Sequence, residues 1–596
     1  MKKSDFDTPQ NNEPVSSFHT TREFIEALGI ALVLAFLFKA FVIELYAIPT
    51  GSMGSTLMGR HKDVNCEVCG FPFQLGASRE VNVEGTPNPR ARNELPSVVG
   101  GTCPQCQYTM YVGSDNLAGQ TYMSFNGDRI FVNKHLFSFR EPSRWHVTVF
   151  RYPDTPQVNY IKRLIGLENE TVMLRNGHVF VQKEGDDQFQ IQRKPLRALL
   201  AMLRPVDDND YVIPAIHELG WKTRWNGDEH WKRSADYKSF TGTGNADELS
   251  WLRFQYITAT TMDWHQLIQD KLPGGNQTGT AQLVTDMVAF NTEILQYPSG
   301  HHWEVYQVET PQSGKVQLCR RNPDGLGYNW VGDLVVQGTL NVEKGGSGKV
   351  VFNLVKGGIN FQCSLSFESD TTLAQFSIPE VPEFEPFSVT VPIRAGRKHN
   401  VMFCNVDEEM RLIIDGKEMD TQGRGRYDAL CLDDSSLCRD RSPTAIDLEP
   451  AAIGVAGNLT VQVEHLKILR NLYYISCDAS AANTVCDLID SPFRFGFSLD
   501  YEESVKQILS KPEYWSTFGK TRRTTFRMEK DQFLMCGDNS AQSKDGRLWT
   551  SDGIPHYVDR ELLIGEAVFV FWPHGLRIPG TRIALIPNFQ KMRWID

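Results

Sequence analysis

The sequence contains no basic stripe, no internal repeat and no low-complexity tract. Its 61 Lys and Arg residues are outnumbered by 72 Asp and Glu residues, which gives a formal net charge of -11. Nucleic-acid-binding proteins carry a basic patch or stripe, so we do not expect a nucleic acid as a partner. The hydrophobic fraction of 41% and the charged fraction of 22% are ordinary for globular proteins and exclude wholesale disorder.

Cysteine is too sparse for a disulfide scaffold, with 12 residues in a chain of 596. Four of them form two C-x-x-C pairs, Cys66 with Cys69 and Cys103 with Cys106. Two such pairs place four thiolates around one tetrahedral zinc ion, although the loop between them is longer than usual. Two disulfides in an oxidising compartment are the alternative. We predict a zinc-ribbon-like insertion over residues 64–120 that is held by a structural zinc.

One hydrophobic run, Phe24 to Ile43, is a candidate for crossing a bilayer. Its uncharged centre, Ala27 to Phe38, is shorter than the roughly 20 residues of a spanning helix, so Lys39 would have to reach the membrane interface with its ammonium group. A cleaved secretory signal is the alternative. We favour an anchor because a candidate active site follows directly. The basic residues before the run predict a cytoplasmic N-terminal tail.

A chain of this length exceeds what one hydrophobic core supports, so several domains or large insertions are expected. Short stretches rich in Val, Ile, Phe and Tyr dominate from residue 122 onward and predict a mostly β protein. Between residues 330 and 474 these stretches alternate regularly, and Asp415-Gly416 is a strong hairpin signal. This region predicts a β-sandwich, similar in texture to the concanavalin-type lectins. The polar, tryptophan-rich stretch before it predicts no particular fold.

Three short segments, far apart in the chain, carry chemical groups. Ser52 lies in IPTGSM, Lys162 lies in the apolar strand-like NYIKRLIGL, and the polar loop CGDNSAQSKDGR begins at Cys536. Taken singly, each has an ordinary explanation: a turn serine, a strand lysine that points to solvent, and an Asx-rich surface turn.

Together the three segments resemble the successive boxes of the type I signal peptidase (leader peptidase) family. The segment FRYPDTPQVNYIKRLIGL carries the second box, and DRELLIGEAVFVFWP is similar to the strand that ends the family's catalytic domain. The resemblance covers residues 20–60, 121–175 and 526–573. The sequence departs from the family at Gly54-Ser55, where a proline is usual, and at Ser540 and Gly546 in the last box.

The resemblance implies a serine endopeptidase with a Ser/Lys dyad and no cofactor in catalysis. Ser52 is then the nucleophile and Lys162 the general base, which must be neutral to accept the serine proton. Burial that lowers the pKa of a lysine from about 10.4 to about 8 costs roughly 3 kcal/mol. By analogy Ser543 orients the lysine, and the hydroxyl of Thr50 joins the Ser52 amide in stabilising the oxyanion. Asp545 and Arg547 match the family's structural ion pair.

The same resemblance implies signal peptides of exported preproteins as substrates. They would lie extended along the site, with small side chains at the positions one and three before the cut. The residues at the matching wall positions are Tyr46, Ile48, Met53, Leu57 and Ile161.

The resemblance predicts a single-pass protein of the plasma membrane with an extracytoplasmic, signal-peptidase-type β catalytic domain that is split by insertions. The predicted parts are a cytoplasmic tail (1–23), a transmembrane anchor (24–43), the nucleophile segment (44–63), the zinc-ribbon-like insertion (64–120), the general-base segment (121–204), an insertion of unknown fold (205–329), a lectin-like β-sandwich (330–474), a connecting segment (475–525) and the final catalytic segment (526–596). The alternative function is a membrane-tethered binding protein that uses the sandwich to hold a partner or glycan.

Overall fold

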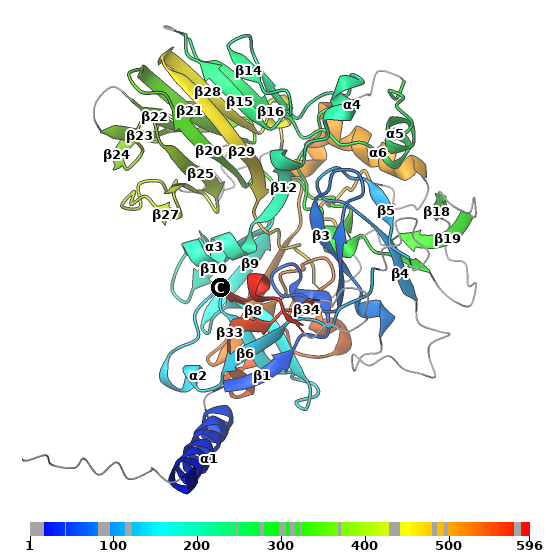
Figure 1. Cartoon of the computed structure of the whole chain (residues 1–596), viewed down its shortest axis with the longest axis vertical. Coiled ribbons are helices and arrows are strands. Elements are labelled where there is room, and N and C mark those ends of the chain that lie inside the picture. Colours follow the sequence, from blue (N-terminus) through cyan, green and yellow to red (C-terminus); the bar gives the residue numbers. More distant parts are fainter. Residues whose placement is uncertain are drawn as a thin grey trace, which may run out of the picture.

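The computed structural model describes residues 17–41, 43–81, 96–113, 122–245, 248–274, 279–296, 306–309, 316–321, 325–367, 371–427, 442–478, 485–493, 499–576 and 586–596. These residues are mostly in strands, as expected. A large sandwich lies at one end of the molecule, the sheets that carry the nucleophile segment lie below it, and helix α1 (Ser17–Phe41) projects from the opposite end (Figure 1). Most of the predicted tail falls outside the described residues.

The eight-stranded antiparallel sheet at the centre is assembled from distant parts of the chain. Its order is β1-β6-β33-β7-β8-β31-β32, and β36 also pairs with β33. The strands are β1 (Ile43–Ala47), β6 (Arg129–Asn133), β7 (Val147–Arg151), β8 (Asn159–Gly166), β31 (Gln532–Cys536), β32 (Val558–Asp559), β33 (Leu563–Trp572) and β36 (Arg593–Trp594). Strand β33, from near the C-terminus, therefore lies between β6 and β7, which come from the first part of the chain.

A smaller sheet of four strands packs beside the central sheet. Its order is β11-β10-β9-β30, from β9 (Glu170–Arg175), β10 (His178–Lys183), β11 (Gln190–Ile191) and β30 (Arg523–Arg527). Buried side chains of this sheet form a cluster with Ile165 and Leu534 of the central sheet, with Trp145 in the turn before β7, and with Tyr474. The shared cluster joins the two sheets into one catalytic body.

The sandwich consists of two further antiparallel sheets whose inner faces share a single hydrophobic core. The first sheet contains β12 (Arg204–Asp208), β14 (Trp231–Arg233), β15 (Ser239–Thr243), β20 (Leu334–Val342), β25 (Lys398–Val406), β26 (Glu409–Ile414), β27 (Lys417–Glu418) and β29 (Thr460–Arg470). The second contains β13 (Trp225–Gly227), β16 (Ser250–Phe254), β21 (Ser347–Lys356), β22 (Ile359–Ser366), β23 (Thr372–Ser377), β24 (Phe387–Val391) and β28 (Ala451–Asn458).

The sandwich begins well before the predicted residue 330. The predicted insertion of residues 205–329 contributes strands to it: β12 and β15 pair with β29, and β16 pairs with β28. Strands β13 and β14 extend the two sheets by pairing with β16 and β15. These strands are only three to five residues long and lie between polar loops. They are too short to show the alternation of apolar and polar residues that identifies a longer strand. The hairpin predicted at Asp415-Gly416 is confirmed, because both residues have positive φ and β26 pairs with β27 around them.

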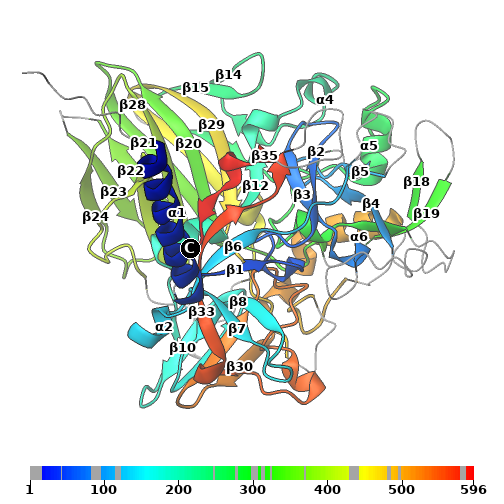
Figure 2. The same cartoon turned by 60° about the horizontal axis from the view of Figure 1, so that its bottom comes forward.

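The cysteine pairs lie in the turns of two small hairpins. Cys66 and Cys69 connect β2 (His61–Asn65) with β3 (Pro72–Gly76), and Cys103 and Cys106 connect β4 (Ser97–Thr102) with β5 (Thr109–Tyr111). Strands β4 and β5 belong to a sheet completed by β17 (Ile294–Gln296), β18 (Tyr306–Glu309) and β19 (Val316–Arg321). The sandwich and these hairpins flank the catalytic strands (Figure 2).

Helices are few among the described residues. They are α1, α2 (Leu136–Phe139), α3 (Leu196–Met202), α4 (Pro214–Glu218), α5 (Thr261–Leu267) and α6 (Leu499–Ser510). The two-stranded sheet of β34 (Gly575–Leu576) and β35 (Ile586–Pro587) completes the regular elements. Within the described part of the chain, no helix combines the length and apolar character that crossing a membrane requires.

Candidate functional site

The serine of the first segment lies in a short 3₁₀ turn directly after β1. This turn, η1 (Gly51–Met53), is closed by a hydrogen bond from the Gly54 amide to the Gly51 carbonyl, 2.9 Å long. Ser52 is partly buried, and its Oγ lies 2.7 Å from Lys162 Nζ. The turn thus presents the hydroxyl to an amine that is 110 residues away in the sequence.

Lys162 reaches the serine from β8. Its side chain is only 4% exposed, and Nζ also donates to the Ile161 carbonyl at 3.1 Å. Burial lowers the pKa of Lys162 from 10.5 to about 8, and the neighbouring carboxylate of Asp545 offsets only part of this effect. Among the described residues Lys162 has no carboxylate in ion-pair contact. A buried amine in this state is partly neutral near neutral pH and can accept a proton.

The loop after β31 donates hydrogen bonds to the backbone carbonyls of the nucleophile turn. The Asn539 amide donates to the Ser52 carbonyl at 3.1 Å, and Asn539 Nδ2 donates to the Gly51 carbonyl at 2.9 Å. The Gly537 amide donates to Asp545 at 2.8 Å within the same loop. These contacts connect the first and third segments directly, and they fix the orientation of Ser52.

Asp545 and Arg547 form the expected ion pair, fully buried at 2.8 Å. Burial opposes the ionisation of Asp545, but Arg547 outweighs it and holds the pKa of this carboxyl below its ordinary value. Arg547 also donates to the carbonyls of Ile475 and Ser540, each at 3.0 Å. The pair therefore ties the third loop to the segment that follows the sandwich.

A second buried ion pair was not foreseen from the sequence. Arg163 is next to Lys162 in the sequence but points to the other face of β8. Its Nε and Nη2 donate to the two carboxylate oxygens of Asp538 at 2.8 and 2.7 Å. Thr56 donates to Asp538 at 2.6 Å, and Arg204 donates to Thr56 at 2.9 Å. Successive residues of a strand point to opposite faces of the sheet. The adjacent Lys162 and Arg163 in YIKRL could therefore have indicated that the two side chains have different partners.

Of the predicted supporting residues, Ser543 is buried and Thr50 is exposed. Ser543 is buried close to Ser52, because a Cβ on Gly537 would lie 2.2 Å from Ser543 Oγ and 2.4 Å from the Ser52 carbonyl. In this structure its Oγ makes no hydrogen bond to Lys162, so the expected bond is not formed. Thr50 is exposed at the entry to the turn, and its side chain does not cap η1.

The five predicted wall residues gather in one hydrophobic cluster beneath the nucleophile turn. Met53 and Leu57 are fully buried and Ile48 nearly so, which places them in the core and not on an open pocket wall. Tyr46 and Ile161 are only partly buried. Of the five, these two therefore offer surface to a substrate.

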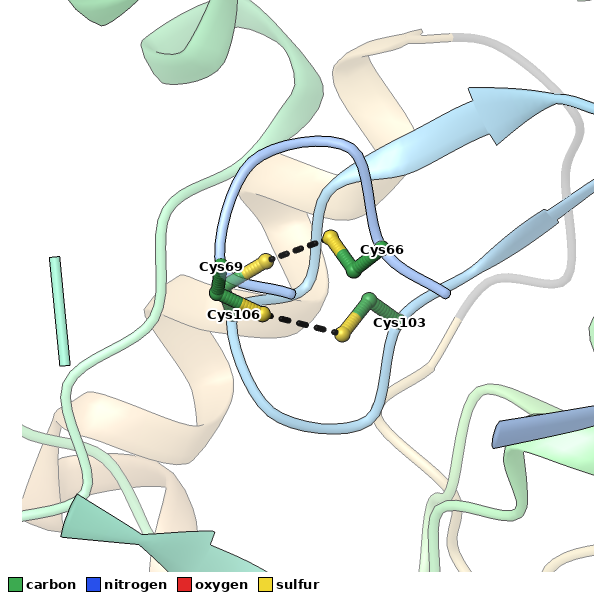
Figure 3. A group of neighbouring side chains, drawn as sticks. All are labelled: Cys66, Cys69, Cys103 and Cys106. Atoms are coloured by element: carbon green, nitrogen blue, oxygen red, sulfur yellow. Dashed lines mark hydrogen bonds between the residues drawn. The ribbon is translucent and has the colours of Figure 1, made fainter. Parts of the chain in front are cut away.

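The four predicted zinc ligands converge from the two hairpin turns (Figure 3). Their sulfur atoms all lie within 4.8 Å of one another, with Cys66 to Cys106 at 3.5 Å and Cys69 to Cys103 at 3.7 Å. Thiolates about 2.3 Å from a tetrahedral zinc are spaced about 3.8 Å apart, whereas a disulfide requires about 2 Å. The four thiols are unbridged here, and their spacing fits a zinc ion.

Two other groups of potential metal ligands are occupied by lysine side chains. In the group of His61, Asp63 and His574, the ammonium of Lys591 lies 2.8 Å from Asp63 and 3.1 Å from His574. The group of His178, Asp333 and Asp407 contains ion pairs to Lys356 and Lys194. Both groups are therefore charge networks that include a lysine.

Residues 115–215 match the family model described as "Signal peptidase, peptidase S26". The signal peptidase I of Pseudomonas fluorescens is 43% identical over 123 residues, which are 15% of this chain and 43% of that protein. The enzyme of Aquifex aeolicus is 46% identical over 46 residues, 8% of this chain and 18% of that protein. That of Rickettsia bellii is 23% identical over 175 residues, 29% and 44% of the two chains. The chain thus spans less than half the length of each of these relatives.

Among solved structures, the chain is similar to a carbohydrate-binding module, CBM66, from Bacillus subtilis, with a TM-score of 0.19 and 8% identity over 41% of this chain and 95% of that one. It is also similar to the galectin LEC-6 of Caenorhabditis elegans, with a TM-score of 0.15 and 10% identity over 23% of this chain and 83% of that one. TM-scores this low establish no shared function. The sequence matches support a signal peptidase, over a small part of the chain.

Proposed function

We propose that this chain is a type I signal peptidase, a membrane-bound serine endopeptidase that removes signal peptides from exported preproteins. The observation that carries the proposal is the 2.7 Å contact between Ser52 Oγ and the buried Nζ of Lys162. A serine hydroxyl becomes an effective nucleophile when a neutral base lies within hydrogen-bond reach. The match of residues 115–215, which include Lys162, to the signal peptidase family model agrees with this chemistry.

The reaction begins when neutral Lys162 accepts the Ser52 proton as Oγ attacks the scissile carbonyl carbon. The carbonyl oxygen becomes an oxyanion, for which the Ser52 amide and the Thr50 hydroxyl are the proposed donors. Protonated Lys162 then gives its proton to the departing amine, and the peptide C–N bond breaks to leave an acyl-serine. Lys162, neutral again, deprotonates a water molecule that attacks the ester, and the serine regains its proton.

Substrate is proposed to bind beside the free edge of the central sheet. Strand β1 is the edge strand of that sheet and leads directly into η1, so an extended peptide that pairs with it passes in front of Ser52. Tyr46 on β1 and Ile161 on β8 supply the partly exposed apolar surface there. Such pairing recognises the backbone and accepts the variable sequences of signal peptides.

The membrane part of the proposal rests on α1. Apolar side chains along this helix, among them Phe24, Ile25 and Leu32, are at least 60% exposed. Exposed apolar surface of this extent needs a partner, and lipid is the partner that suits a helix projecting from the catalytic end. Retention of the chain in the pellet after alkaline carbonate washing of membranes supports the anchor, and complete release contradicts it.

The cysteine cluster is proposed to hold one structural zinc. The zinc would fasten the two hairpins to each other, and the hairpins in turn pack against the insertion through Trp264, whose Nε1 donates to the Cys106 carbonyl at 3.0 Å. Tetrathiolate sites of this kind are closed to substrate and contribute to folding. The zinc takes no part in the peptidase reaction.

The decisive test compares cleavage of a preprotein with an Ala-x-Ala site by the parent and by Ser52→Ala. A matched control is Ser388→Ala, an exposed serine on sandwich strand β24. We expect cleavage by the parent and the control and none by Ser52→Ala. Equal cleavage by parent and Ser52→Ala would refute the assigned nucleophile, and no cleavage by any of them would favour the binding-protein alternative.

A further inference from the structure

A short turn from the insertion lies against the nucleophile turn. This turn, η4 (Ala289–Asn291), is far from Ser52 in sequence, yet it packs with β3 of the cysteine-bearing hairpins and with η1. Phe290 is 3% exposed and Asn291 is fully buried. A buried side chain of the insertion thus contacts the turn that carries Ser52.

Asn291 and Asn539 form a reciprocal pair of amide hydrogen bonds. Asn291 Nδ2 donates to Asn539 Oδ1 at 2.6 Å, and Asn539 Nδ2 donates to Asn291 Oδ1 at 2.7 Å. The same Nδ2 of Asn539 donates to the Gly51 carbonyl at 2.9 Å. If the Asn539 amide turned over, its oxygen would face the Gly51 carbonyl, and two acceptors would oppose each other. The Gly51 carbonyl therefore selects this orientation of the Asn539 amide, and Asn291 holds the amide in place by pairing with both its oxygen and its nitrogen.

Phe290 supports the same turn from a different direction. Its ring fills the space beside three glycines: an added Cβ would lie 2.3 Å from the ring at Gly51, 3.1 Å at Gly54 and 2.9 Å at Gly76. A side chain at Gly51 or Gly76 would force the Phe290 ring to move, and one at Gly54 would crowd it. The nucleophile turn is thus held between this ring and the loop that carries Asn539.

We propose that Asn291 and Phe290 are positioning residues for the nucleophile, so that the insertion is part of the peptidase's active unit. The inference rests on the proposed function of Ser52. Asn291 acts through Asn539 on the backbone that carries Ser52, and it touches neither Ser52 Oγ nor Lys162. Misplacing a reacting atom by about 1 Å lowers catalysis on the order of 100-fold, whereas binding of the extended substrate along β1 is left intact.

The kinetic test compares Asn291→Ala with Asn353→Ala. Asn353 lies on sandwich strand β21 and donates to Asn360 at 2.9 Å, so its variant also loses an amide–amide bond but remote from the site. We expect kcat of Asn291→Ala to fall about 10-fold or more with KM nearly unchanged, and Asn353→Ala to retain the parental kcat. Parental kcat in Asn291→Ala would overturn the proposal.

A double-mutant cycle tests the route through Asn539. Because Asn291 acts by orienting Asn539, the variant Asn291→Ala/Asn539→Ala should be no slower than Asn539→Ala alone. Additive losses would overturn the route. Phe290→Leu, which keeps the core apolar, provides a second variant with the same expected fall in kcat at unchanged KM if Asn291→Ala does not fold.

Hydrogen exchange separates failure of this inference from failure of the proposed function, because it needs no substrate. In the full chain, Asn291→Ala should increase amide exchange over residues 47–59, and Asn353→Ala should leave that segment unchanged. Faster exchange in Asn291→Ala than in the parent would uphold the positioning role even if the parent cleaves no preprotein, a result that would refute the peptidase. Unchanged exchange in Asn291→Ala would overturn the inference, whatever the parent cleaves.

Discussion

Replacing Lys162 with methionine should abolish cleavage and yet stabilise the folded chain below pH 8. Lys162 is buried without an ion-pair partner among the described residues, and burial lowers its pKa from 10.5 to about 8. At roughly 1.36 kcal/mol for each pKa unit, that difference corresponds to about 3 kcal/mol. This is the free energy by which the charged lysine destabilises the folded state relative to the neutral lysine.

The pH dependence fixes the sign of the effect. Below pH 8 the lysine is charged in both the folded and the unfolded chain, so the full cost of burying the charge is present. Between pH 8 and 10.5 the unfolded chain binds more protons, and the parent gains stability as the pH rises. Above 10.5 the lysine is neutral in both states and the cost is absent. The stability advantage of Lys162→Met should therefore shrink by about 3 kcal/mol over this interval.

Urea unfolding of parent and variant at a series of pH values measures this difference, because transitions in the rest of the chain are common to both proteins and cancel. Lys194→Met is the contrasting control, since Lys194 is buried in an ion pair with Asp407 at 2.9 Å and its loss should destabilise the chain. An advantage of Lys162→Met that does not shrink between pH 8 and 10.5 would refute the reasoning that burial makes this lysine a base.

Three further outcomes follow from buried contacts. The parent should contain about one zinc per chain by atomic absorption and Cys66→Ser almost none, with a buried sandwich cysteine as control; a metal-free parent would contradict the zinc proposal. Arg163→Met leaves the Asp538 carboxylate buried without its bidentate partner, which should lower the free energy of unfolding by about 3–5 kcal/mol, and an unchanged urea midpoint would contradict it. Gly51→Ala brings a methyl group to 2.3 Å from the Phe290 ring, so kcat should fall sharply in a cleavage assay, and full activity would show that the turn adapts.

The pairing of Ser52 with Lys162 was predicted because their segments, taken together with the loop after Cys536, resemble the boxes of the type I signal peptidase family. Met53 and Leu57 show the limit of that reasoning. An apolar residue beside a nucleophile suits either a pocket wall or the core, and composition alone does not separate the two. Both residues proved fully buried. The preference for the core is physical, since a buried Met or Leu side chain contributes roughly 1.5–3 kcal/mol.

The role of Asn291 could not be read from the sequence. It lies in a three-residue turn inside an insertion, with no periodicity and no motif. Its contact to Asn539 spans 248 residues, and such pairs are fixed by tertiary packing alone. The start of the sandwich was predicted too late in the chain for a related reason. Strands β13 and β14 are only three residues long, so they have too few alternating positions to be recognised as strands from the sequence.

The position of β33 has a consequence for how the chain matures. This strand, Leu563–Trp572, pairs with both β6 and β7, which are synthesised more than 400 residues earlier. Until β33 has left the ribosome, β6 and β7 have no strand between them and the sheet that carries Lys162 stays open. The order of synthesis thus delays closure of the central sheet until β33 has been made.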